Sequence, residues 1–223
     1  MSQNNQSHSY PEAKLPLVVD ASSTPLHLGI PGAEGWEKLV SDEGQVMEGL
    51  FRALRKLFNG RSDKLNSVDA VYYCCGPGST LGLRLAAAFV KTLIWESEGK
   101  TMLYQYNALD MAASFPNNSH KLIQAPFRMG KRFVRSGEPL CIGKKEIFPE
   151  EKAIGEYPDS LHLPGMRALS VELPADKTLK YDLEKVSGLE VLKQISEPIE
   201  SPAPYSPEPA TFKKWEPVIP TKQ

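Results

Sequence analysis

The 223-residue sequence lacks a charge-free apolar run of about 18 residues, the length that a membrane-spanning helix needs. It is also poor in cysteine, with three residues of this type. Two of them, Cys74 and Cys75, are adjacent, and an odd number of cysteines is typical of reduced thiols. Residues 1–10 are rich in Ser, Asn and Gln and have no apolar core, which argues against a secretory signal peptide. We therefore expect no membrane association and a cytoplasmic location.

Several catalytic signatures are missing as well. None of the four histidines lies three or four residues from another, so the sequence has no helical pair of metal ligands. It has no Gly-x-Ser-x-Gly nucleophile elbow. Cys75 has no histidine near it in the sequence, which makes it a weak candidate nucleophile. We expect no catalytic residue, no bound metal and no cofactor.

The charge balance excludes a strongly basic protein. The formal net charge is -1, with 24% charged and 41% hydrophobic residues, an ordinary balance for a globular chain. Because phosphate contacts dominate affinity for nucleic acids, we expect weak binding of nucleic acid by this chain alone.

The most informative stretch runs from residue 70 to residue 95. Residues 70–75 form an apolar run typical of a buried strand, and residues 81–95 are apolar on nearly every side, which indicates a buried helix. Between them lies Gly76-Pro77-Gly78-Ser79, where Ser79 or Thr80 is expected to cap the helix. The turn is not a P-loop, because no lysine follows it before Lys91, and its glycine spacing differs from the dinucleotide fingerprint. A tight capped turn and an anion site at the helix N-terminus both remain open.

The pattern around this stretch predicts a ribonuclease-H-like half domain. Three short strands joined by tight turns indicate an antiparallel meander, and an amphipathic helix follows, capped by Ser41 or Asp42 and closed by Asn59-Gly60. The predicted order is strand 15–19, strand 25–30, strand 36–40, helix 45–58, strand 70–75, helix 81–95 and strand 102–106.

The second half is less regular. Asn107 is expected to cap a short helix that ends near Phe115, and residues 121–126 and 131–135 resemble two paired strands. Residues 185–195 are predicted to form a helix around Gly188. From residue 197 onward, seven prolines in 27 residues exclude regular helix or central strand.

The turn and helix start resemble a known family. Gly76-Pro-Gly-Ser-Thr-Leu-Gly-Leu-Arg84 is similar to the Gly-Pro-Gly-Ser-Phe-Thr-Gly-Leu-Arg signature of the TsaB (YeaZ) family. Thr80-Leu81 stand where that signature has Phe-Thr. Weaker similarities lie at Asp20-Ala-Ser22, Asn107 to Ala112, Arg128-Met-Gly130 and 207–215. The matching positions are Gly76, Pro77, Gly78, Ser79, Gly82, Leu83 and Arg84.

The resemblance implies an α/β actin-like ATPase (ribonuclease-H-like) fold, with two lobes of mixed sheets flanked by helices. We place a disordered leader at 1–14, a first lobe at 15–106, a second lobe at 107–196 and a proline-rich tail at 197–223. The implied function is that of a non-catalytic subunit supporting a larger, related ATP- and metal-binding enzyme, TsaD, in making threonylcarbamoyladenosine beside the tRNA anticodon. The implied partners are a TsaD-like subunit, a second copy in its absence and the ATPase subunit TsaE, with tRNA bound only through the complex.

Two other classes of function remain open. An active ATPase or kinase relative would use residues at the end of the first strand, where Asp20, Ser22 and Ser23 are candidates for a vestigial phosphate loop. An NAD(P)-binding oxidoreductase is disfavoured by the early antiparallel meander, since a Rossmann unit begins with a βαβ unit. Arg84 lies in the first turns of a buried helix, so we expect it to pair with Asp20 or Asp69, or to contact a partner or an anion.

The predicted interface lies on the helix over residues 45–58. Its apolar stripe is wide, and the helix over 81–95 is apolar almost all round, so one face of a sheet is not expected to cover both. The candidate interface residues are Met47, Leu50, Phe51, Leu54 and Phe58.

Overall fold

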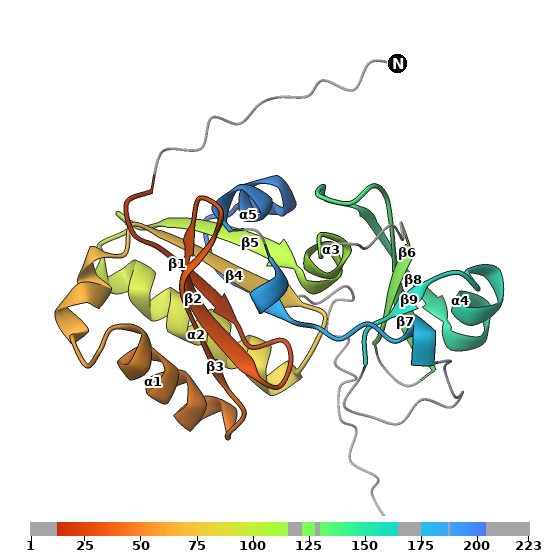
Figure 1. Cartoon of the computed structure of the whole chain (residues 1–223), viewed down its shortest axis with the longest axis horizontal. Helices are drawn as coiled ribbons and strands as arrows, with labels where there is room; N and C mark the ends of the chain where they lie inside the picture. Colours follow the sequence, from red (N-terminus) through yellow and green to blue (C-terminus); the bar gives the residue numbers. More distant parts are fainter. Residues whose placement is uncertain (1–12, 116–121, 128–129, 165–174, 187, 204–223) are drawn as a thin grey trace, which may run out of the picture.

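The computed structural model contains two β-sheets with helices packed around and between them (Figure 1). It describes residues 13–115, 122–127, 130–164, 175–186 and 188–203. Most of the predicted leader, residues 204–223 of the predicted tail and the Arg128-Met129 similarity lie outside the described residues.

The first half of the chain has the predicted order of elements. Three strands, a helix, a strand, a helix and a strand follow one another, with a short 3₁₀ segment, η1, before the fourth strand. The elements are β1 (Pro16–Asp20), β2 (Leu26–Gly32), β3 (Gly35–Asp42), α1 (Val46–Leu57), η1 (Ser62–Ser67), β4 (Ala70–Gly76), α2 (Thr80–Glu96) and β5 (Met102–Asn107).

These strands form a six-stranded mixed sheet in the order β10-β5-β4-β1-β2-β3. β1, β4 and β5 are parallel, while β2 and β3 form the antiparallel meander. Side chains alternate between the faces of this sheet, and every residue of β4 is buried, as its apolar composition predicts. α1 and α2 cover one face, where Leu50 and Val90 share an apolar cluster with Val71 and Tyr73. α3 and α5 cover the other face.

The second half contains a smaller sheet in the order β8-β7-β6-β9. A meander is again followed by a helix and a parallel fourth strand, so this sheet repeats the β3-β2-β1-β4 order of the first. Its elements and those that follow are α3 (Ala108–Ala113), β6 (Leu122–Pro126), β7 (Lys131–Ser136), β8 (Lys144–Pro149), α4 (Glu150–Glu156), β9 (Leu161–His162), η2 (Ala175–Lys177), η3 (Leu183–Lys185), α5 (Leu189–Ile195) and β10 (Ser196–Pro198).

One apolar core joins the two sheets. α3 lies between them, and its residues share a cluster with Tyr72 of the first sheet and Phe133 of the second (Figure 1). α5 and β10 return to the first sheet, where Ser196 pairs with Tyr106 on β5. α5 (Leu189–Ile195) and β10 (Ser196–Pro198), which lie on either side of the boundary that we placed after residue 196, therefore both belong to the first sheet.

Two local predictions are wrong in detail. The predicted helix 185–195 is divided into η3 and α5 by Gly188, whose φ of 84° is left-handed. The cap of α1 is not Ser41 or Asp42, because β3 extends through Asp42 and the helix begins after Gln45 without a side-chain cap. Asp42 instead accepts bonds from the Gly44 amide and from the Arg52 guanidinium.

The Arg52–Asp42 pair predicts a specific acid sensitivity. Hydrogen bonds from Arg52 lower the pKa of Asp42 from its ordinary 3.8 to about 2. Since the folded-state pKa is the lower one, the stabilisation is complete above the ordinary value and is lost as pH falls toward 2. We expect Arg52→Met to unfold at a lower urea concentration than wild type at neutral pH. The urea midpoints of the two proteins should converge as the pH falls to about 2. Exposed Arg55→Met serves as the control, and a gap between Arg52→Met and wild type that does not change with pH would contradict the assignment.

No helix in the described part of the chain has the length and apolar character required to cross a bilayer.

Candidate functional site

The turn between β4 and α2 is held by contact with the turn after β1. The Ser79 side chain caps α2 by accepting from the Gly82 amide at 3.2 Å, as predicted, and the Ser79 amide donates to the Ser22 carbonyl at 2.7 Å. A Cβ at Gly78 would lie 2.1 Å from the Ser22 carbonyl oxygen, and one at Gly82 would lie 1.9 Å from the Ala21 carbonyl oxygen. The motif glycines therefore allow two backbone turns to touch, which supports the tight capped turn over an open anion site.

The other motif residues divide between core and surface. Pro77 and Leu83 are buried, whereas Arg84 is exposed. The predicted pairing of Arg84 with Asp20 or Asp69 is wrong. Asp69 accepts from the backbone amides of residues 14 and 15, and Asp20 faces the opposite side of the sheet from α2. Arg84 reaches solvent, which avoids the cost of burying its charge.

Asp20 lies at the centre of a buried polar cluster. Oδ1 accepts from the amide and the hydroxyl of Ser22, at 2.9 and 2.6 Å. Oδ2 accepts from the hydroxyls of Tyr106 and Tyr181, at 2.7 and 2.6 Å. Ser23 turns away and donates to the Pro25 carbonyl at 3.4 Å. Of the three phosphate-loop candidates, only Asp20 and Ser22 are thus bonded to each other. A cation or nucleotide would have to displace the protein's own donors to reach the Asp20 carboxylate.

The two adjacent cysteines point to opposite faces of β4, as expected for neighbours in a strand. Burial raises the pKa of the Cys75 thiol to about 12 and that of the Cys74 thiol well above its ordinary value. Because the thiolate is the nucleophile, both groups are poorly suited to covalent catalysis. Within the described residues, no group of three or more His, Cys, Asp or Glu side chains is arranged to hold a metal.

An apolar groove of about 1140 Å³ lies between α1 and α2. Met47 and Phe51 stand on its α1 side and are 60% and 56% exposed. Leu50 and Phe58 are buried beneath them, and Leu54 is partly buried. The lining residues are Met47, Leu50, Phe51, Leu54, Arg55, Phe58, Gly60, Arg61, Asp63, Leu65, Asn66, Val68, Leu85, Ala88, Phe89, Thr92, Leu93, Glu96, Ser97 and Thr101.

All five predicted interface residues line this groove, but only two of them are strongly exposed. The α2 side was not predicted residue by residue. Leu85, Phe89 and Leu93 line it, and their four-residue spacing is a signal that could have identified them. Tyr106 and Tyr181, the partners of Asp20, had no such signal, because they lie 86 and 161 residues away from it in the sequence.

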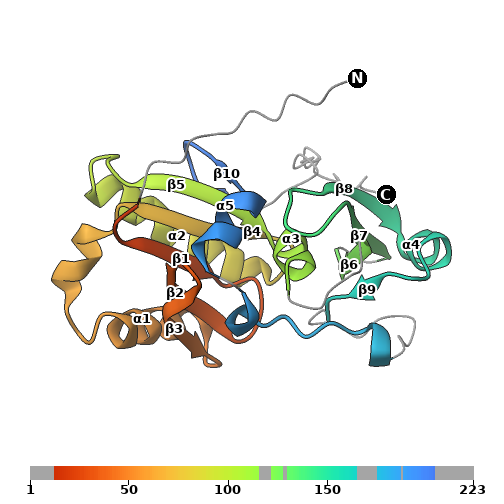
Figure 2. The same cartoon turned by 45° about the horizontal axis from the view of Figure 1, so that its top comes forward.

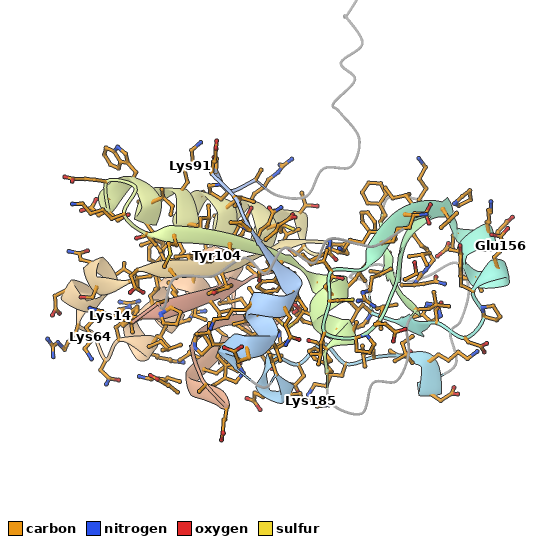
Figure 3. The ribbon with its side chains drawn as sticks, turned by 90° about the horizontal axis from the view of Figure 1, so that it is seen from above. Lys14, Lys64, Lys91, Tyr104, Glu156 and Lys185 are labelled. Carbon is orange, nitrogen blue, oxygen red and sulfur yellow. The ribbon has the colours of Figure 1, made fainter. Side chains whose placement is uncertain are left out.

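The groove lies far from the second sheet. Its lining residues all fall between 47 and 101. Figure 3 shows Lys64, in η1 beside the groove, and Glu156, in α4 of the second sheet, toward opposite ends of the molecule. The second sheet therefore does not cover the groove.

Comparison with known proteins identifies the fold. No model of a known family and no curated protein matches the sequence. A crystal structure from Pseudomonas aeruginosa, described as a protein with similarity to the peptidase YeaZ, matches with a TM-score of 0.50 and 16% identity, over 67% of this chain and 74% of that chain. The chain has a YeaZ-like fold. YeaZ from the same organism aligns with a TM-score of 0.49 and 16% identity, over 67% of this chain and 75% of that chain.

The YeaZ-like fold confirms the predicted fold class, an actin-like ATPase arrangement with two mixed sheets flanked by helices. At this identity the similarity establishes the fold only.

Proposed function

We propose that this chain is a TsaB-like partner subunit that binds a larger, related TsaD-like enzyme through the α1–α2 groove. In this role it supports threonylcarbamoylation of the adenosine next to the tRNA anticodon and has no catalytic residue of its own. The observation that carries the proposal is the open apolar groove, on a YeaZ-like fold whose β4–α2 turn resembles the TsaB signature.

The groove has the character of a protein interface. Soluble monomers seldom leave a contiguous apolar patch of this kind exposed, and exposed aromatic and Met side chains are enriched at interfaces. Met47 and Phe51 are both more than half exposed on the same face of α1, four residues apart. A partner with the same pair of helices would cover them by helix-to-helix packing.

The charges along α1 fit such a partner. Acidic Glu43 and Glu48 lie near its N-terminal end, and basic Arg55 and Lys56 lie in its last turn. A two-fold axis perpendicular to this helix would pack two copies antiparallel, so that the acidic end of one meets the basic end of the other. We therefore propose a homodimer through the groove when the TsaD-like subunit is absent, and the heterodimer in its place when that subunit is present.

The Asp20 cluster supports an accessory role. Its carboxylate is already bonded to four donors of the chain, so the alternative function as an ATPase or kinase would require Tyr106 and Tyr181 to leave. Because the net charge is -1, we propose that tRNA is bound through the complex in the cytoplasm, with TsaE as a further candidate partner.

A pair of exposed apolar residues tests the proposal. Phe51→Asp should weaken both self-association and binding to the TsaD-like subunit by about tenfold or more, because it places a charge on the apolar α1 side of the groove. Ile142→Asp is the matched control, since Ile142 is 48% exposed but lies on the second half of the chain. Sedimentation at graded concentrations and affinity capture of the TsaD-like subunit measure the two affinities. A strictly monomeric wild type that captures no such subunit would reject the proposal.

A further inference from the structure

Residues 178–182, which we call the strap, connect the two sheets on the face opposite the groove. At one end Thr178 forms a bridge with His162 of β9, and the Leu179 amide donates to the His162 carbonyl at 2.9 Å. At the other end the chain enters η3, where the Leu183 carbonyl accepts from the Trp36 indole of β3 at 2.7 Å. The strap is part of the connection that runs from β9 back to the first sheet (Figure 2).

Tyr181 fastens the strap to the first sheet. Its ring is buried against Phe115, with the ring centres 5.7 Å apart, and its hydroxyl donates to Asp20 Oδ2 at 2.6 Å. Tyr106 donates to the same oxygen at 2.7 Å, but it comes from β5 within the first sheet. The two tyrosines therefore make the same kind of bond to the same atom, and only the Tyr181 bond holds the strap.

The other junction between the sheets is more strongly bonded. Asp110 of α3 contacts Arg135 of β7 at 2.9 Å and Lys145 of β8 at 2.6 Å, and both Asp110 and Arg135 are at most 1% exposed. Local opening starts where few buried contacts resist it. In the strap, Thr178 and Lys180 are exposed and Leu179 is only partly buried.

We propose that the strap is a latch: Tyr181 leaves Asp20 and residues 178–182 lift, while the two sheets stay joined at α3 and Leu183 stays in the core. Opening exposes the Asp20 cluster to solvent on one face of the first sheet. It leaves the groove intact, because α1 and α2 cover the opposite face.

Two neighbouring thiols report this opening. Cys74 lies on the strap face of β4, in the same cluster as Tyr181, and Cys75 lies on the α2 face. Lifting the strap exposes Cys74 to a thiol reagent and leaves Cys75 covered, whereas global unfolding exposes both. The ratio of the two alkylation rates therefore separates latch opening from loss of the fold.

The test compares Tyr181→Phe with Tyr106→Phe in the full chain, using N-ethylmaleimide and mass spectrometry of the peptide that contains both cysteines. We expect Tyr181→Phe to raise the Cys74-to-Cys75 rate ratio by about tenfold or more, the factor associated with losing a hydrogen bond to a charged group. Tyr106→Phe should leave the ratio near that of wild type. An unchanged ratio in Tyr181→Phe, or an equal rise in both variants, would overturn the latch.

If Tyr181→Phe does not fold, wild type in sub-denaturing urea gives the answer. The latch requires Cys74 to react faster than Cys75 at urea concentrations below the unfolding transition, and equal rates there contradict it. The latch rests on contacts independent of the groove. A Tyr181→Phe chain that associates normally but keeps the wild-type ratio would reject the latch and leave the proposed function standing.

Discussion

Gly82→Ala is expected to destabilise the chain by about 3 kcal/mol or more, or to prevent it from folding, because the added Cβ meets rigid backbone. The new atom would lie 1.9 Å from the Ala21 carbonyl oxygen and 3.3 Å from Ser79 Cβ. Ala21 follows directly after β1, which pairs with strands on both sides and cannot shift without breaking the sheet. Urea unfolding followed by circular dichroism measures the loss.

Gly155→Ala is the matched control. This glycine lies in α4, and a Cβ there would meet no atom within 4 Å. We expect a change within about 1 kcal/mol, in the stabilising direction, because alanine favours helix. If Gly82→Ala proves equally mild, the turns are free to separate and the contact does not explain why glycine stands at that position.

The Gly82 test also separates two explanations of the family-like motif. A glycine that leaves room for a ligand tolerates alanine with little loss of stability, whereas a glycine that packs one turn on another does not. The sequence alone left both open, since a glycine turn before a helix suits either one. The structure favours the packing explanation, because the β1–β2 turn, some sixty residues earlier in the chain, lies against the motif.

The sequence predicted what depends on near neighbours. The short strands and tight turns of the first meander, the unbroken apolar run of β4 and the caps at Ser79 and Asn107 are local signals, and the structure confirms them. The wide stripe of α1 likewise predicted the α1 side of the groove. A local signal failed at Asp42, because pairing with Leu26 on β2 extends β3 past the predicted cap.

What depends on distant residues was not predictable. The bonds from Tyr106 and Tyr181 to Asp20 and the pairing of β10 with β5 join segments that no spacing rule relates. The burial of charged side chains could not be predicted from the sequence for the same reason. The pattern over residues 131–135 predicts a strand and does not show that both Arg132 and Arg135 are fully buried. Their partners lie on other elements, so only the tertiary structure shows how these charges are tolerated.

Removing one such partner should be costly. Asp110→Asn is expected to destabilise the chain by about 3–5 kcal/mol, because it leaves buried cations without their counter-ion. The carboxylate accepts from Arg135 Nε at 2.9 Å, Lys145 Nζ at 2.6 Å and the Gly143 amide at 2.9 Å, and it is 1% exposed. The urea midpoint and the slope of the transition, measured at neutral pH, give the change in unfolding free energy.

Asp63→Asn is the control, since Asp63 pairs with Arg61 at 2.9 Å while both side chains stay more than 60% exposed. Solvent screens that pair, so we expect no measurable shift of the urea midpoint in the Asp63→Asn variant. Adding Lys145→Met to Asp110→Asn should recover part of the lost unfolding free energy, because one of the two unpaired cations is then gone. The double variant should therefore lose less unfolding free energy than the two single variants lose together. If Asp110→Asn is instead as mild as Asp63→Asn, the buried cations find other compensation, and the junction at α3 is not the strong attachment between the two sheets.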